Sequence, residues 1–492
     1  MDSMLPSFTD FEKLHREGKS QLVWAWVSAD LETPVSAYLK LAGDKENTFL
    51  LESVEGGATL GRYSSIGLDP DIVWTYKKGS EPDPLSSLRK LVRESRIDVV
   101  APEIPPMGSS GMFGFMGYDM VRLIEDVPDE NPDTLGIPDS VMIRPTIMVT
   151  FDNVQSRISI VTPVRYDKNI SAKDAYDAAI RRIENVMEKL ANPLPSTSLH
   201  HTTKIDSDLP VSSNMEKSAF FDMVEKAAEY IRAGEIFQVV LGQRFSLPFD
   251  LPAFSLYRSL RRLNPSPFLF YFNFGGFHLV GSSPEILVRV RNKRVTIRPI
   301  AGTRRRGKTA EEDAALAEEL LADPKERAEH LMLLDLGRND VGRVAKTGTV
   351  RVTDKFAVER YSHVMHIVSN VEGELRDDLD SLDALFAGFP AGTVSGAPKV
   401  RAMEIIDELE PVRRSYYAGC IGYLDGNGDL DTCIALRTAL VKDGKVYVQA
   451  SGGIVADSTP EFEYNESVIK ARAIVQAAQE AISAASAKTN RA

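Results

Sequence analysis

Residues 268–299 read FLFYFNFGGFHLVGSSPEILVRVRNKRVTIRP, and this stretch decides the fold. Four short strand-like runs, 268–274, 277–281, 286–291 and 295–299, are rich in apolar residues and are separated by segments that contain Gly, Ser, Pro, Asn and Lys. Such runs are typical of β-strands bounded by turns. Because the runs follow one another without a helical segment between them, they favour an antiparallel sheet over a parallel, doubly wound one.

The same pattern recurs in both halves of the chain, together with helical spacing. Further strand-like runs occur at 48–53, 72–76, 147–151, 158–161, 350–355, 419–424 and 445–450. Helical spacing of apolar residues occurs at 172–190, 216–233, 310–320, 323–335, 382–386, 399–408 and 460–485. The sequence therefore predicts an α+β fold. We expect antiparallel sheets packed face to face with helices outside, and one large core shared by the N-terminal and C-terminal parts.

A segment rich in Pro, Ser and Thr, residues 191–213, interrupts the periodic pattern. Such a composition is typical of a linker or a long loop. We therefore predict an N-terminal domain over 1–195, a linker over 196–212 and a C-terminal domain over 213–485.

Composition narrows the class of protein. The chain has 492 residues, 43% of them hydrophobic, and a formal net charge of −12. These values are typical of a globular protein and exclude a collagen-like or disordered one. No apolar run is long enough to span a bilayer, and residues 1–10 do not resemble a secretory or transit segment, so we expect a cytoplasmic protein without a membrane partner. The acidic balance argues against a nucleic-acid partner.

The two cysteines, Cys420 and Cys433, are too few for a disulfide framework or a zinc site. Cys420 lies in a glycine-flanked sequence that faintly resembles a nucleophilic elbow. Its strand-like surroundings favour a buried structural cysteine instead.

Two pairs of glutamates at helical spacing carry the first chemical signal. Glu326 and Glu329 follow the helix start Asp323-Pro324, and Glu463 and Glu466 follow a second start at 459–460. If the two helices converge, the four carboxylates could hold one Mg²⁺, which prefers a few carboxylates plus water and substrate oxygens. The alternatives are a capping partner for Glu326 and solvated acid pairs for the rest.

Several longer segments closely resemble those of the chorismate-utilising enzymes. They are GSSPE (281–285), RPIAGTR (298–304), EHLMLLDLGRND (329–340), MHIVS (365–369), FPAGTVSGAPK (389–399) and GIVADS (453–458). In the N-terminal part, LLES (50–53) and GRYS (61–64) resemble the regulatory domain of the anthranilate synthase component I group. The resemblance covers nearly the whole chain.

Two positions choose between the branches of this family. Members that add water to chorismate carry a lysine where this chain has Gln238, and aminodeoxychorismate synthases typically carry one where it has Ala301. The resemblance therefore implies the branch that adds ammonia, the anthranilate synthases. These feedback-inhibited enzymes make anthranilate and pyruvate in the first committed step of tryptophan biosynthesis. Two alternatives stay open: a synthase that stops at aminodeoxyisochorismate, and a catalytically silent regulator that binds tryptophan.

The resemblance also implies partners and roles for individual residues. No amidotransferase motif is present, so ammonia would come from glutamine through a separate amidotransferase subunit, component II. Glu329 and Glu466 would hold Mg²⁺, with Glu326 and Glu463 binding it directly or through water. Glu285 would be the general acid, and His366 would act in the loss of pyruvate. The remaining implied residues are the nucleophile-selecting Gln238, the substrate contacts Gly302, Thr303, Thr393, Tyr417, Arg437, Ser451, Gly452 and Gly453, and a tryptophan site formed by Ser53, Pro267, Phe268 and Leu269.

Overall fold

The computed structural model describes residues 4–55, 59–105, 107, 110–195, 209–361 and 364–489. Twenty strands of the described residues form one network. They are β1 (Gln21–Ser28), β2 (Thr48–Glu52), β5 (Tyr63–Tyr76), β6 (Met112–Met116), β7 (Ser140–Asp152), β8 (Arg157–Val164), β9 (Ser212–Ser213), β10 (Gln238–Pro248), β11 (Phe268–Asn273), β12 (His278–Ser283), β13 (Ile286–Arg291), β14 (Arg294–Ile297), β15 (Ile300–Arg305), β16 (Arg351–Arg360), β17 (Val364–Glu374), β18 (Gly396–Ala397), β19 (Cys420–Leu424), β20 (Leu430–Ile434), β21 (Thr438–Lys442) and β22 (Lys445–Ile454). Strands β3 (Val54–Glu55) and β4 (Thr59–Leu60) form a separate pair.

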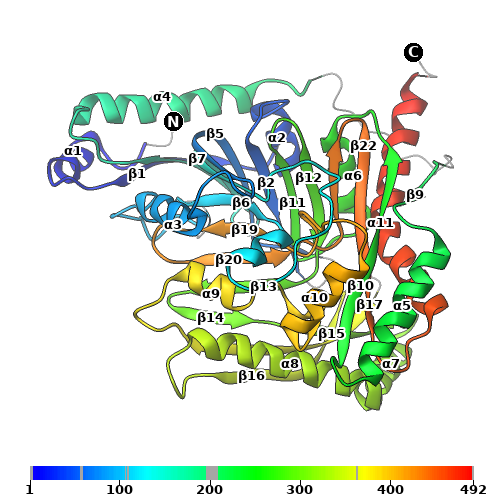
Figure 1. Cartoon of the computed structure of the whole chain (residues 1–492). Coiled ribbons are helices and arrows are strands. Elements are labelled where there is room, and N and C mark those ends of the chain that lie inside the picture. Colours follow the sequence, from blue (N-terminus) through cyan, green and yellow to red (C-terminus); the bar gives the residue numbers. More distant parts are fainter. Residues whose placement is uncertain are drawn as a thin grey trace.

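Helices cover the outside of this network, as Figure 1 shows for α4, α8 and α11. The α-helices are α1 (Phe8–Arg16), α2 (Pro34–Leu41), α3 (Pro84–Glu94), α4 (Ala172–Ala191), α5 (Lys217–Arg232), α6 (Ala253–Leu263), α7 (Ala310–Ala322), α8 (Pro324–Val344), α9 (Ser381–Ala387), α10 (Lys399–Leu409) and α11 (Pro460–Thr489). Two short 3₁₀ turns are η2 (Tyr118–Leu123) and η4 (Gly392–Val394).

The strand pairings follow one antiparallel path that divides at β7. The path runs β10–β22–β21–β12–β11–β2–β5–β7, with β9 and β18 also paired to β10. The first residues of β7 pair with β6, and its last residues pair with β8, which pairs with β1. From β6 the path continues through β19, β20, β13, β14 and β17, and β15 and β16 both pair with β17. A long strand shared by two layers turns the sheet back on itself.

The side chains of β2 point alternately to the two faces of the sheet, and their contacts show how the layers are arranged. Phe49 points inward, where its ring stacks on Phe113 of β6 with centroids 4.7 Å apart, although β2 and β6 are not hydrogen-bonded neighbours. Leu50 points the other way, into an apolar cluster that also contains residues of α2, α4, α6 and α11. Successive side chains of a strand point to opposite faces, so one core lies between the layers and a second lies under the helices. The predicted α+β fold, with antiparallel layers face to face and helices outside, is confirmed.

The N-terminal and C-terminal parts share this core, also as predicted. β11 pairs with β2 in the register Leu269↔Glu52, and β19 pairs with β6 in the register Cys420↔Met116. The boundaries 1–195 and 213–485 stay a prediction, and residues 196–208 of the predicted linker lie outside the described residues.

Two expected elements are present but extend beyond their expected bounds, and the strand β10 was not expected. The helix expected over 323–335 continues to Val344 as α8. The strand expected over 350–355 is the longer β16. β10 was not expected because the buried polar residues Gln238, Gln243 and Arg244 interrupt its apolar run.

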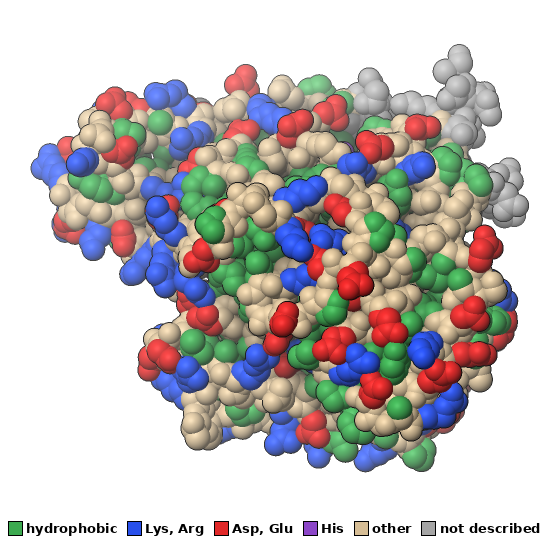
Figure 2. Space-filling view, viewed as in Figure 1, with side chains coloured by type: hydrophobic (Ala, Val, Ile, Leu, Met, Phe, Trp, Pro, Cys, Tyr) green, Lys and Arg blue, Asp and Glu red, His purple; other side chains and the backbone are tan. Residues whose placement is uncertain are grey.

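The charged side chains are spread over the surface, and acidic and basic groups are interspersed on the face that Figure 2 shows. None of the helices in the described ranges is long and apolar enough to cross a membrane.

Candidate active site

A cavity of about 500 Å³ lies between α8, α11 and the strands β10, β15, β17 and β22. Every residue predicted to act on substrate, metal or nucleophile lines it except Gly452, which lies directly behind two of the glutamates. The lining residues among them are Gln238, Glu285, Gly302, Thr303, Glu326, Glu329, His366, Thr393, Tyr417, Arg437, Ser451, Gly453, Glu463 and Glu466. Long-range pairing gathers them, since β10 binds β22 and β15 binds β17.

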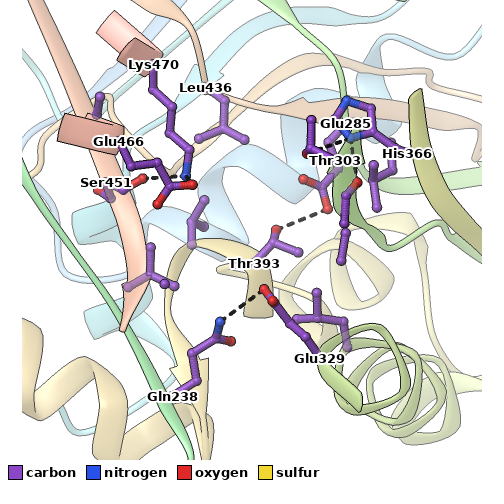
Figure 3. A pocket seen from close by; sticks show the side chains of 18 of the residues that line it. Gln238, Glu285, Thr303, Glu329, His366, Thr393, Leu436, Ser451, Glu466 and Lys470 are labelled. Atoms are coloured by element: carbon purple, nitrogen blue, oxygen red, sulfur yellow. Dashed lines mark hydrogen bonds and ion pairs between the residues drawn. The ribbon is translucent and has the colours of Figure 1, made fainter. Parts of the chain in front are cut away.

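Glu285 occupies one wall of the cavity and is only 6% exposed. Burial raises the pKa of its carboxyl to about 8, because the charged form loses its hydration. The hydroxyl of Thr393 donates a hydrogen bond to Glu285 Oε1 over 3.1 Å (Figure 3). Glu285 therefore carries a proton at neutral pH, as a general acid must.

His366 lies on β17 and lines the same cavity as Glu285, and the irregular stretch of β15 around Gly302 holds its ring. Its Nδ1 is 2.9 Å from the carbonyl oxygen of Gly302 and 3.1 Å from Thr303 Oγ1. Burial lowers the pKa of His366 to about 4, so the ring is neutral at pH 7. Since a carbonyl only accepts, we infer that Nδ1 carries the hydrogen and that Nε2 keeps its lone pair. The neutral ring can then act as a base.

The four glutamates enter from two helices. Asp323 caps α8 by accepting from the backbone N–H of Lys325 and Glu326, and Pro324 occupies the first helical position. Glu329 follows one turn later, and burial, then the charge of Glu326, raise its pKa. From α11, Glu463 also has a raised pKa, chiefly through burial. Carboxylates crowded in this way favour a bound cation.

Two observations indicate that the carboxylates of the four glutamates suit a divalent cation. Glu463 Oε2 is buried and has no hydrogen-bond partner among the described residues. Gly452 leaves room for the carboxylates, because a Cβ there would lie 2.5 Å from Glu463 Oε2 and 2.9 Å from Glu466 Oε2. Within the described ranges no three His, Cys, Asp or Glu side chains are already close enough to hold a metal ion. Glu326 instead pairs with Arg304 at 2.8 Å, and this side chain is not the capping partner that the sequence left open.

Gln238 is buried at the start of β10. Its Nε2 lies 3.4 Å from Glu329 Oε1, and its Oε1 has no partner among the described residues. A Cβ on Gly453 would lie 2.5 Å from that Nε2, so glycine makes room for the amide. Ala301 also lines the cavity. Neither position offers an amine.

Arg437 supplies positive charge on the wall near Glu285. The acidic groups that act on its pKa are Glu285, Tyr361 and Tyr417. Burial raises the pKa of all three, so each carries its proton at neutral pH. The guanidinium is charged under any ordinary condition. It is thus available for a carboxylate of a ligand.

Sequence reasoning missed two lining residues of α11, Phe462 and Lys470. Lys470 Nζ lies 3.2 Å from Glu466 Oε1 and donates to the carbonyl of Ser451 over 2.9 Å. The spacing of four residues after Glu466 could have revealed it, since residues four apart share a helix face.

A second cavity, of about 760 Å³, lies where the N-terminal and C-terminal parts meet. The predicted tryptophan-site residues Ser53, Pro267, Phe268 and Leu269 all line it. Glu52 also lines it, but its carboxylate is bound by Arg261 through contacts of 2.8 and 2.9 Å.

Comparison with known proteins decides the family. The family described as chorismate binding enzyme matches residues 46–476. The chain is a chorismate-binding enzyme.

Close relatives of this chorismate-binding enzyme share one name. The chain is 52% identical to anthranilate synthase component 1 of Cereibacter sphaeroides, covering 97% of the chain and 98% of the relative. It is 45% identical to the protein of that name from Pseudomonas aeruginosa, with 95% and 97% covered.

Solved structures agree on the fold. The anthranilate synthase component I of Streptococcus pneumoniae superposes with a TM-score of 0.77 at 38% identity, covering 91% of this chain and 98% of that one. The menaquinone-specific isochorismate synthase of Escherichia coli gives 0.70 at 22% identity, covering 96% and 99%, which speaks for the fold alone.

Proposed function

We propose that this chorismate-binding enzyme is the large subunit of an anthranilate synthase and converts chorismate and ammonia to anthranilate and pyruvate, the first committed step of tryptophan biosynthesis. One observation carries the choice of reaction. A protonated acid, Glu285, and a neutral base, His366, share a cavity in which Gln238 and Ala301 stand where related enzymes have lysine. The names of the relatives support the same reaction.

Chorismate carries two carboxylates, and different groups of the cavity would bind each of them. Arg437 suits the enolpyruvyl carboxylate, because a planar guanidinium binds a carboxylate through two parallel hydrogen bonds. Glu329 and Glu466 would hold Mg²⁺ near the ring carboxylate, with Glu326 and Glu463 bound directly or through water. When bound there, Mg²⁺ would neutralise that carboxylate and draw electron density toward it.

In the first step, ammonia attacks C2 of the ring and the C4–oxygen bond breaks. Hydroxide is a poor leaving group, so Glu285 gives its proton to that oxygen and water leaves. The new C2–ammonium group releases one proton, which balances the proton consumed. The product is aminodeoxyisochorismate.

In the second step, the ring becomes aromatic. His366 Nε2 accepts the proton from C2 as the bond between C3 and the enolpyruvyl oxygen breaks. The released enolpyruvate takes a proton on its methylene carbon and becomes pyruvate, and anthranilate remains. A positioned base of this kind contributes about 10²–10⁴-fold to the rate.

Ammonia at neutral pH is scarce, and we infer that a separate glutamine amidotransferase, component II, supplies it. The name component 1 of the relatives implies such a second component. Gln238 and Ala301 leave the nucleophile to be delivered from outside. An assembly of this biosynthetic kind would work in the cytoplasm.

The second cavity suits L-tryptophan as a feedback inhibitor. Phe268 and Leu269 provide an apolar wall for an indole, and Ser53 provides a polar group for the amino-acid end. The carboxylate of Glu52 is already neutralised by Arg261, so it is not the partner of the amino group. Pro284 and Ile300 line both cavities, and Pro284 directly precedes the acid Glu285. A ligand in the second cavity could therefore move the acid.

The test is the purified chain with chorismate, Mg²⁺ and an ammonium salt. We expect fluorescent anthranilate and pyruvate, with no turnover in the Glu329→Gln or Glu466→Gln variants. A non-aromatic amine without pyruvate would establish the aminodeoxyisochorismate alternative. Tryptophan binding without turnover would establish a silent regulator.

A further inference from the structure

Lys470 brings a positive charge into the glutamate cluster, defined as Glu326, Glu329, Glu463 and Glu466. Its Nζ lies 3.2 Å from Glu466 Oε1, and the carbonyl of Ser451 fixes the ammonium from the other side at 2.9 Å. In Figure 3 the side chain extends from α11 toward Glu466 and Ser451, on the side of the cavity opposite His366.

The charge of Lys470 acts on both helices of the cluster. It lowers the pKa of Glu329 on α8 and that of Glu463 on α11, in each case against the larger effect of burial. Two other basic residues of the cavity wall, Arg304 and Lys325, form no ion pair with Glu466 among the described residues. Arg304 binds Glu326 and Asp323, and Lys325 binds Asp457 at 2.9 Å. Lys470 is therefore the cation that compensates Glu466.

We propose that Lys470 is a built-in counter-ion, a positioning residue that holds Glu466 until a divalent cation displaces it. This inference rests on the proposed metal site. The ammonium and a divalent cation both bind the carboxylate of Glu466, so binding of the cation weakens the contact between Lys470 and Glu466. Without substrate, the site then binds a divalent cation weakly. Lys470 meanwhile keeps the glutamates ordered and compensates part of their negative charge.

The size of the effect follows from electrostatics. At salt-bridge distance near a protein surface, one unit charge changes a binding constant by more than tenfold. The side chains of Lys470 and Glu466 are 39% and 35% exposed, so solvent screens part of this electrostatic interaction. We expect removal of the ammonium to tighten divalent-cation binding by about tenfold.

The experiment measures Mn²⁺ binding to the full chain, by electron paramagnetic resonance, without chorismate. Lys470→Met should bind Mn²⁺ about tenfold more tightly than the wild type, and Lys470→Arg, which keeps the charge, should stay within about twofold. Lys217→Met is the matched control. Lys217 of α5 forms a 3.0 Å ion pair with Glu461, which lies on α11 like Glu466 but outside the glutamate cluster. It should not change the affinity.

Thermal unfolding with and without Mn²⁺ provides a second readout. In the presence of a chelator, Lys470→Met should unfold at a lower temperature than the wild type. Addition of Mn²⁺ should raise the unfolding temperature of Lys470→Met by more than that of the wild type. Unchanged or weaker Mn²⁺ binding by folded Lys470→Met would overturn the inference, as would a wild type that binds no Mn²⁺ at all. If the wild type makes no anthranilate but Lys470→Met still binds Mn²⁺ more tightly than the wild type does, the proposed reaction is refuted and this inference stands.

Discussion

The burial that raises the pKa of Glu285 makes this residue a useful proton donor, but it should also lower the free energy of unfolding. Its pKa rises from 4.5 to about 8 on burial. Below pH 4.5 both the folded and the unfolded chain hold the proton, so there is no penalty. As the pH rises from 4.5 to 8, only the unfolded chain releases the proton, and the free energy of unfolding falls. Above pH 8 both states release it and the penalty is constant.

The magnitude follows from the two pKa values. The difference of about 3.5 pH units, at 1.36 kcal/mol each, gives a full penalty of about 5 kcal/mol above pH 8. At pH 7 the penalty is about 3 kcal/mol, since only the interval from 4.5 to 7 counts. Glu285→Gln keeps the shape and can still accept from the Thr393 hydroxyl, but it cannot ionise.

We therefore expect Glu285→Gln to be more stable than the wild type by about 3 kcal/mol at pH 7 and about equally stable at pH 4.5, while its turnover falls about 10²–10⁴-fold. Denaturant unfolding at pH 4.5, 7 and 8.5 measures the first effect and anthranilate fluorescence the second. Glu94→Gln, at a half-exposed position on α3, is the matched control and should change neither. A stability difference between Glu285→Gln and wild type that does not grow with pH would refute the reasoning.

Three further predictions concern the same two cavities. His366→Ala should release a non-aromatic amine instead of anthranilate, detected as loss of fluorescence while chorismate is still consumed; full anthranilate formation would contradict its role as a base. Gly452→Ala should abolish the Mg²⁺-dependent reaction, because its Cβ would lie 2.5 Å from Glu463 Oε2, whereas the control Gly276→Ala meets nothing within 4 Å and should be active. Phe268→Ala should weaken inhibition by tryptophan about tenfold or more with kcat unchanged, and equal inhibition of variant and wild type would remove the second cavity as the site.

Local pattern made the layered fold and most of the first cavity predictable. Successive side chains along 269–280 point alternately into the two cores, and the spacing of Glu463 and Glu466 is the spacing of one helix face. β10 could not be predicted in this way, since the buried polar residues Gln238, Gln243 and Arg244 interrupt its apolar run. The contact between Lys470 and Ser451 joins α11 to β22, and the shared wall of Pro284 and Ile300 joins two cavities. Such contacts depend on tertiary packing, which spacing along the chain does not encode.

The central claim is that this cavity joins ammonia to chorismate and then expels pyruvate. The most direct measurement supplies the purified chain with chorismate, Mg²⁺ and ¹⁵N-ammonium and follows both products by mass spectrometry. The account predicts ¹⁵N-anthranilate and pyruvate in equal amounts. Isochorismate or salicylate, or an amine that retains the enolpyruvyl group, would contradict it.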